Sequence, residues 1–162
     1  MDGTGDLGGV KRGSGRNNIP LEDELNAALQ AWSKMEKSLG SNRQASSFNT
    51  TTIVYDANTG KYYYGMNKGI SLSGDKANTI LFGDGTVKGI LPEKSLNKYI
   101  VGNCAEMDAI NQALNDGARL SDLYMYTTHT TPNQFGVPKI ACENCTYSIK
   151  DVIAGALSGF SN

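Results

Sequence analysis

Residues 102–110, GNCAEMDAI, and residues 141–145, ACENC, together contain all three cysteines of the chain. The first cysteine is followed two residues later by Glu106, and the other two form a C-x-x-C pair. An odd number of cysteines with a single C-x-x-C argues against a disulfide framework and favours a metal or redox site. Because thiolate sulfur is a preferred ligand of zinc, the pattern predicts a zinc site formed by Cys104, Cys142 and Cys145.

Both cysteine motifs are expected to lie at the start of a helix. Apolar residues recur at helical spacing after Cys104 as far as Gly117, and again after Cys142. At a helix start, unpaired N–H groups and the positive end of the helix dipole favour thiolate over thiol. Cys142 and Cys145, three residues apart on a helix, face the same side and can bind one ion together. Two such helix starts aimed at one point would surround the ion with three thiolates.

Glu106 separates a structural zinc site from a catalytic one. A structural site is closed by four protein ligands, whereas a catalytic site keeps one position open. The chain has only three cysteines, so a closed site would need His129, Asp108 or Glu143 as its fourth ligand. Three thiols without any metal are the remaining alternative. We favour the open site, because C-x-E and C-x-x-C occur together in the order known for zinc with a non-ligating carboxylate.

The two motifs resemble the zinc-binding signature of the cytidine-deaminase superfamily. The resemblance covers roughly residues 48–155. Taken together, the two motifs and the glycine-rich N-terminal stretch are most similar to the toxin deaminases at the C-terminal tips of bacterial polymorphic toxins, with the YwqJ-like group as the best match. The resemblance implies an α/β fold, a cytidine-deaminase-like mixed β-sheet with helices packed on its faces. Two features depart from the family pattern. Ala141 stands where a proline is usual, and residues 130–140, which border the base pocket in relatives, form a longer connection.

The resemblance implies zinc-dependent hydrolytic deamination, a hydrolase reaction at a C–N bond. The three cysteines would hold the zinc, and Glu106 would move protons from water to the ring and the departing ammonia. Our first choice of substrate is cytosine in nucleic acid, with single-stranded DNA preferred because the target base must be unstacked to reach the pocket. RNA, free nucleosides or nucleotides, and a zinc-stabilised binding module without chemistry remain alternatives.

The resemblance also suggests residues that contact the substrate and a biological setting. It places substrate contacts at Asn67, Ala105 and His129. Asn67 matches the asparagine that follows the hairpin in many family members, and a turn-forming role before Lys68 is an equal alternative. A toxin-type domain would belong to a secreted bacterial effector acting in the cytoplasm of a target cell. Whether a cognate immunity protein exists is left open.

Composition excludes several classes of function. With 162 residues, 39% of them hydrophobic and 19% charged, the chain is expected to form one ordinary globular domain. No apolar run approaches the roughly 20 residues of a membrane span, so no membrane partner is expected, and the N-terminus lacks the pattern of a signal peptide. A formal net charge of −1 argues against a protein that binds duplex DNA, because the neutralisation of phosphates by Lys and Arg supplies much of the affinity for DNA. Any nucleic acid is expected to be held by the basic middle of the chain, at Lys68, Lys76, Lys88, Lys94 and Lys98.

Hydrophobic periodicity and turn residues predict the order of the elements. Residues 1–18, glycine-rich and polar, are expected to be a flexible linker or a truncated end, and residues 19–162 the deaminase domain. Glycines recur through residues 65–100, which predicts a long loop with a short helix near 96–100. This loop is a candidate lid. The remaining expected elements are a helix over 21–39, a hairpin with strands at 47–55 and 61–64, and a strand at 123–128.

Overall fold

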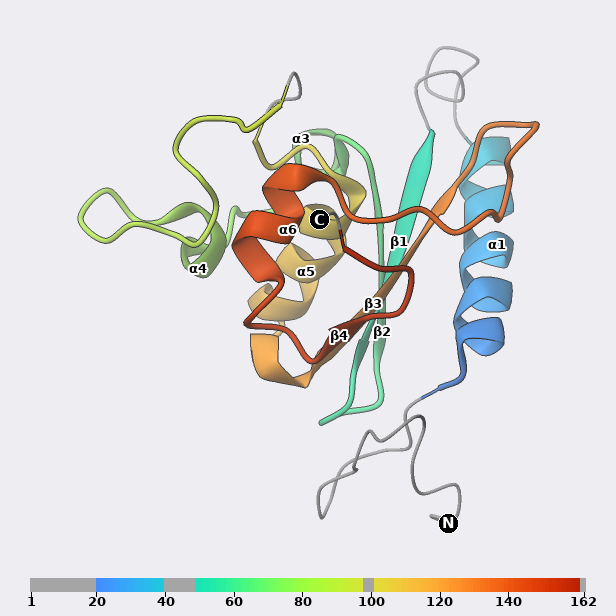
Figure 1. The fold of residues 1–162 in the computed structure, drawn as a ribbon, viewed down its shortest axis with the longest axis horizontal. Helices are drawn as coiled ribbons and strands as arrows, with labels where there is room; N and C mark the ends of the chain where they lie inside the picture. The colour runs from blue at the N-terminus through green and yellow to red at the C-terminus, as the bar shows by residue number, and fades with distance from the viewer. Residues whose placement is uncertain (1–19, 40–48, 98–100, 161–162) are drawn as a thin grey trace.

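The computed structural model describes residues 20–39, 49–97 and 101–160, so the linker expected at residues 1–18 lies outside the described residues. The described chain forms a four-stranded mixed sheet with helices on both faces. Helix α1 (Glu22–Leu39) covers one face, and α5 (Ala105–Asn115) and α6 (Glu143–Ile149) lie on the other (Figure 1). The predicted α/β fold with a mixed sheet between helices is confirmed.

Strand β1 (Thr50–Asp56) lies in the middle of a sheet whose order is β2-β1-β3-β4. It pairs antiparallel with β2 (Tyr62–Met66) and β3 (Leu123–His129), while the short β4 (Gly155–Ala156) is parallel to β3. Every residue of β1 is buried, as expected for a strand covered by helices on both faces. The predicted hairpin and third strand are confirmed. Strand β4 was not predicted, because a two-residue strand carries no periodicity.

The two faces of the sheet carry separate cores. On the α1 face, Leu25 and Leu29 are fully buried in a cluster that includes Tyr126, and the buried Ser33 Oγ lies 2.9 Å from Thr51 Oγ1. The helix predicted over residues 21–39 is therefore confirmed, and its apolar stripe faces the sheet. The opposite core joins α5 and α6 to β1 and β3 through Val54, Met107, Ile110, Met125 and Ile149.

Helix α5 lies directly against the backbone of β2. A Cβ atom on Gly65 would lie 2.5 Å from both Ala105 O and Ala109 N, so only glycine permits this approach. The Asp108 carboxylate accepts a hydrogen bond of 2.9 Å from the Met66 N–H on the outer edge of β2. These contacts fix the first turns of α5 relative to the end of the hairpin.

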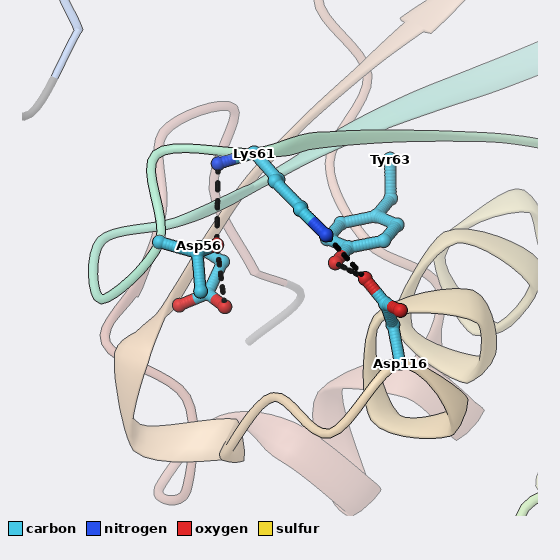
Figure 2. Close-up of polar contacts among 5 residues, drawn as sticks. Asp56, Lys61, Tyr63 and Asp116 are labelled. Atoms are coloured by element: carbon cyan, nitrogen blue, oxygen red, sulfur yellow. Dashed lines mark hydrogen bonds and ion pairs between the residues drawn. The ribbon is translucent and has the colours of Figure 1, made fainter.

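The other end of α5 is joined to the turn of the hairpin and the beginning of β2. The turn between β1 and β2 is closed by Asp56, whose carboxylate accepts hydrogen bonds from Asn58 N–H and the Thr59 hydroxyl. Figure 2 shows Lys61 and Tyr63 pointing toward Asp116, which follows the last residue of α5. Lys61 Nζ lies 3.2 Å from Asp116 Oδ2, and the Tyr63 hydroxyl donates to the same oxygen. The lysine offsets a negative charge that is unfavourable at a helix C-terminus.

Residues 65–97, which the sequence predicted as part of a long loop and candidate lid, are more regular than a loop. They contain α3 (Gly69–Ser73) and α4 (Thr79–Phe82), and Leu81 is buried in the core beside α5. Asn111 of α5 accepts a hydrogen bond of 2.7 Å from Asn78 N–H and donates one of 2.9 Å to Lys76 O. These tertiary hydrogen bonds hold the segment along α5, which periodicity could not indicate. Residues 96–97 are not helical, and the rest of the predicted helix at 96–100 lies outside the described residues.

The remaining described helix is a 3-10 turn, η1 (Leu120–Asp122), before β3. Among the helices that the structure describes, none is both long and apolar enough to cross a bilayer.

We predict that Gly65→Ala destabilises the protein by about 2 kcal/mol or more, because the added methyl group forces α5 away from β2. The midpoint of urea unfolding measures the effect. Gly155→Ala is the matched control, since its Cβ would lie 3.4 Å from Tyr124 Cδ2, an ordinary contact, and should change stability by less than about 0.5 kcal/mol. Equal and small effects of both substitutions would contradict the close approach.

Candidate metal centre

The three cysteine sulfurs converge on one point. Cys104 Sγ lies 2.9 Å from Cys142 Sγ, which lies 3.5 Å from Cys145 Sγ, and all three sulfurs lie within 4.8 Å of one another. Sulfurs that share a tetrahedral zinc ion with Zn–S bonds of about 2.3 Å are about 3.8 Å apart. The two separations that involve Cys142 are shorter than this value, and no two of the sulfurs are more than 4.8 Å apart. The three thiols therefore fit a metal ion, and their chemistry suits zinc.

The start of each helix positions these sulfurs, as the sequence predicted. Cys104 is the residue that precedes α5 and Cys142 the residue that precedes α6, both with extended backbone conformations. Cys145 lies one turn into α6 and is fully buried. Hydrogen bonding with Cys104, and then with Cys145, lowers the pKa of Cys142 well below that of an ordinary thiol. The same network of sulfur hydrogen bonds raises the pKa of Cys104 and of Cys145. The cluster is thus arranged around one thiolate, Cys142, and binding of a metal ion releases the protons of the other two thiols.

Glu106 lies beside the sulfur cluster without belonging to it. Its side chain is 3% exposed, and its Oε1 lies 3.8 Å from Cys145 Sγ. Burial raises the pKa of Glu106 to about 7, against the opposing effect of a hydrogen bond with Thr127 of β3. The Thr127 hydroxyl lies in turn 2.7 Å from Thr52 Oγ1 of β1. A carboxyl group held in this way between two strands and the cluster can take up and release protons near neutral pH.

None of the alternative fourth ligands joins the cluster. Within the part of the chain that the structure describes, the only group of three or more His, Cys, Asp or Glu side chains arranged for a metal is the cysteine triplet. Asp108 instead accepts hydrogen bonds from Met66 N–H and the Gln112 amide. Glu143 is exposed, and His129 lies apart from the sulfurs. This arrangement favours a metal site with an open position.

A cavity of about 380 Å³ opens next to the cluster, with Cys104, Cys142 and Glu106 in its wall. It lies where β2 and β3 end and β1 begins, beside the starts of α5 and α6. Its volume falls in the range of small-molecule sites. The wall also contains all three predicted substrate contacts, Asn67, Ala105 and His129.

Asn67 and His129 are held in place by the strands around the cavity. Asn67 Oδ1 accepts hydrogen bonds from the backbone N–H groups of Asn49, at 3.1 Å, and Thr50, at 3.2 Å. The residue therefore fixes the beginning of β1 as well as lining the cavity. Its contact with a substrate stays a prediction. His129 is half-buried at the end of β3, where burial and then the charge of Lys139 lower its pKa.

The long connection after β3 supplies a cavity residue that the sequence analysis missed. It folds back along β3, with hydrogen bonds from His129 N–H to Val137 O at 2.9 Å and from Lys139 N–H to Thr127 O at 2.8 Å. This places Lys139 in the cavity wall. The unusual length of the connection was the only sequence signal, and it did not identify the residue.

The basic middle of the chain contributes less to the site than expected. Of the predicted lysines, Lys68 lines the cavity. Lys88 forms an exposed ion pair of 2.9 Å with Glu93, and Lys98 lies outside the described residues. The positive charge at the cavity thus comes from Lys68 and Lys139, which are far apart in the sequence.

Comparison of the chain with protein-family models, curated proteins and solved structures finds no match. The function must therefore be inferred from the chemistry and geometry of the site itself.

We predict that the purified protein binds about one zinc ion per chain, and that Cys142→Ser loses the ion together with much of the thermal stability. Elemental analysis and thermal unfolding measure the two effects. Tyr147→Ser is the matched control, because Tyr147 lies on the same helix and is 67% exposed. Wild-type protein that stays free of metal after incubation with zinc would contradict the site.

Proposed function

We propose that the protein is a zinc-dependent hydrolytic deaminase that converts cytosine to uracil in nucleic acid, with single-stranded DNA as the first choice of substrate. One observation carries the proposal: three thiols converge beside a cavity whose wall includes two of them, and the carboxyl group of Glu106 lies beside them as a separate group. Three protein ligands with an open position are characteristic of catalytic zinc, and the added non-ligating glutamate is characteristic of nucleobase deaminases.

In the proposed reaction the three cysteines bind the metal and Glu106 transfers protons. Cys104, Cys142 and Cys145 would hold the zinc, which when bound supplies Lewis acidity and lowers the pKa of water. Glu106 accepts a proton from the attacking water and delivers protons to the ring nitrogen and to the leaving amine. The net reaction consumes one water and releases one ammonia. Thr127 and Thr52 keep the Glu106 carboxyl oriented between the two strands during both transfers.

The cavity supports a catalytic site over a purely structural one. A zinc ion that only stabilises the fold is enclosed by four protein ligands and needs no cavity next to it. Here the cavity wall includes two of the three cysteines. Asp108 of α5, an alternative fourth ligand, instead accepts a hydrogen bond from Met66 N–H at the edge of β2. The resemblance of the two motifs to toxin deaminases makes a secreted effector domain the setting that we propose for this activity.

We predict that Glu106→Gln keeps the zinc and the fold but lowers the rate of cytosine deamination by at least about 100-fold, because it removes the group that moves protons. Mass spectrometry of oligonucleotides and nucleosides incubated with zinc-loaded protein detects the product. Glu143→Gln is the matched control, since it removes an exposed carboxylate next to Cys142 and should leave the rate unchanged.

Two results would contradict the proposal. The first is full activity of Glu106→Gln. The second is a wild-type protein that carries zinc but forms no uracil product from single-stranded DNA, duplex DNA, RNA or free nucleosides. The second result would favour a zinc-stabilised binding module.

A further inference from the structure

Two lysines lie in the cavity wall on either side of the start of β1. Lys68 follows β2 and Lys139 lies in the connection after β3, the two strands that flank β1. Because both flanking strands run antiparallel to β1, their ends meet its beginning at the cavity. Within residues 20–39, 49–97 and 101–160, neither lysine forms an ion pair with a carboxylate. The cavity wall therefore has two positive groups that no carboxylate of the described residues neutralises.

Lys68 has a backbone conformation that favours glycine. Its φ of 63° is the only positive φ at a non-glycine residue in the described part of the chain. Its N–H donates a hydrogen bond of 2.9 Å to Asn103 O, next to Cys104, so the strained turn is tied directly to the start of α5. An L-residue is disfavoured in this region, and such outliers gather at functional sites. The local backbone alone does not account for a lysine here.

Lys139 is oriented into the site by its own contacts. Its side chain is half-buried, and its Nζ donates a hydrogen bond of 2.8 Å to Thr50 Oγ1, another residue of the cavity wall. Lys139 shares the cavity wall with both Glu106 and His129. Lys139 thus lies across the start of β1 from Lys68.

We infer that Lys68 and Lys139 bind a phosphate group of the substrate, so that the enzyme acts on cytosine nucleotides or polynucleotides and not on free nucleosides. The inference rests on the proposed function for the base that enters the cavity. Lysine ammonium groups bind phosphate oxygens through charge-assisted hydrogen bonds. A phosphodiester of a strand and the phosphate of a mononucleotide offer the same chemistry to the two lysines.

A different role for the two lysines is charge balance. A zinc ion with three thiolates carries a net charge of about −1, and an ionised Glu106 would add to it, so two ammonium groups would offset negative charge beside the cavity for any substrate. Lysines that only balance this charge affect nucleoside and nucleotide substrates equally, whereas lysines that bind phosphate affect nucleotides alone. The ratio of efficiencies between the two kinds of substrate therefore separates the roles.

The experiment compares kcat/KM for deoxycytidine, its 5′-monophosphate and a short oligo(dC) on the zinc-loaded full chain. The variants are Lys68→Gly and Lys139→Met, and Lys88→Met is the matched control from the exposed ion pair with Glu93. Each cavity variant should lose about tenfold or more with the accepted phosphate-bearing substrate and less than about twofold with deoxycytidine. Lys68→Gly should also unfold at the same or a higher temperature, because it relieves the positive φ.

Preference for the oligonucleotide or for the monophosphate identifies the source of the phosphate, and either preference supports the inference. Equal losses with all three substrates, or a wild-type enzyme that is as efficient on deoxycytidine as on both phosphate-bearing substrates, would overturn it. Calorimetric titration with deoxycytidine and its monophosphate needs no turnover, so it decides the inference even if no deamination is found. Weaker binding of the monophosphate to the cavity variants alone would support the subsite, and unchanged binding would overturn it.

Discussion

The close contact between the backbone of α5 and Gly65 of β2 is the constraint on which the site depends. Without a side chain at this position, Ala105 and Ala109 approach the hairpin directly. Asp108 then reaches Met66 N–H, and Asn103 O reaches Lys68 N–H. These hydrogen bonds fix the start of α5 against the end of β2. The element that carries Cys104 and Glu106 is consequently held in one position relative to the cavity residues that follow the hairpin.

The chemistry of the site follows from where these elements end. The ends of β2 and β3, the beginning of β1 and the starts of α5 and α6 meet at one side of the molecule. Helix starts favour thiolates, so Cys104 and Cys142 are placed where the negatively charged form that binds a metal ion is stabilised. Glu106 is buried behind them and contacts β3 through Thr127. Lys68 follows β2 and Lys139 lies in the connection after β3, so the positive groups of the cavity come from segments that follow the two strands flanking β1.

Much of the fold and of the site could be predicted because the signals are local. Helix α1, the hairpin and the helices after the cysteine motifs follow from periodicity and turn residues. The pairing of Cys142 with Cys145 follows from their spacing, and the approach of Cys104 to them is what the resemblance of the two motifs to a known zinc signature implied. What could not be predicted depends on contacts between distant segments. Lys139 reaches the cavity only because the connection after β3 folds back onto that strand, and α4 is held by Asn111 of a helix far along the chain.

X-ray absorption at the zinc edge of the zinc-loaded protein tests the central claim most directly, because it identifies the atoms around the ion. We expect three sulfur neighbours at about 2.3 Å and one oxygen neighbour at about 2.0 Å, which is the signature of an open position next to Glu106. An imidazole nitrogen from His129 as the fourth neighbour, or a first shell without three sulfurs, would contradict a catalytic centre formed by Cys104, Cys142 and Cys145.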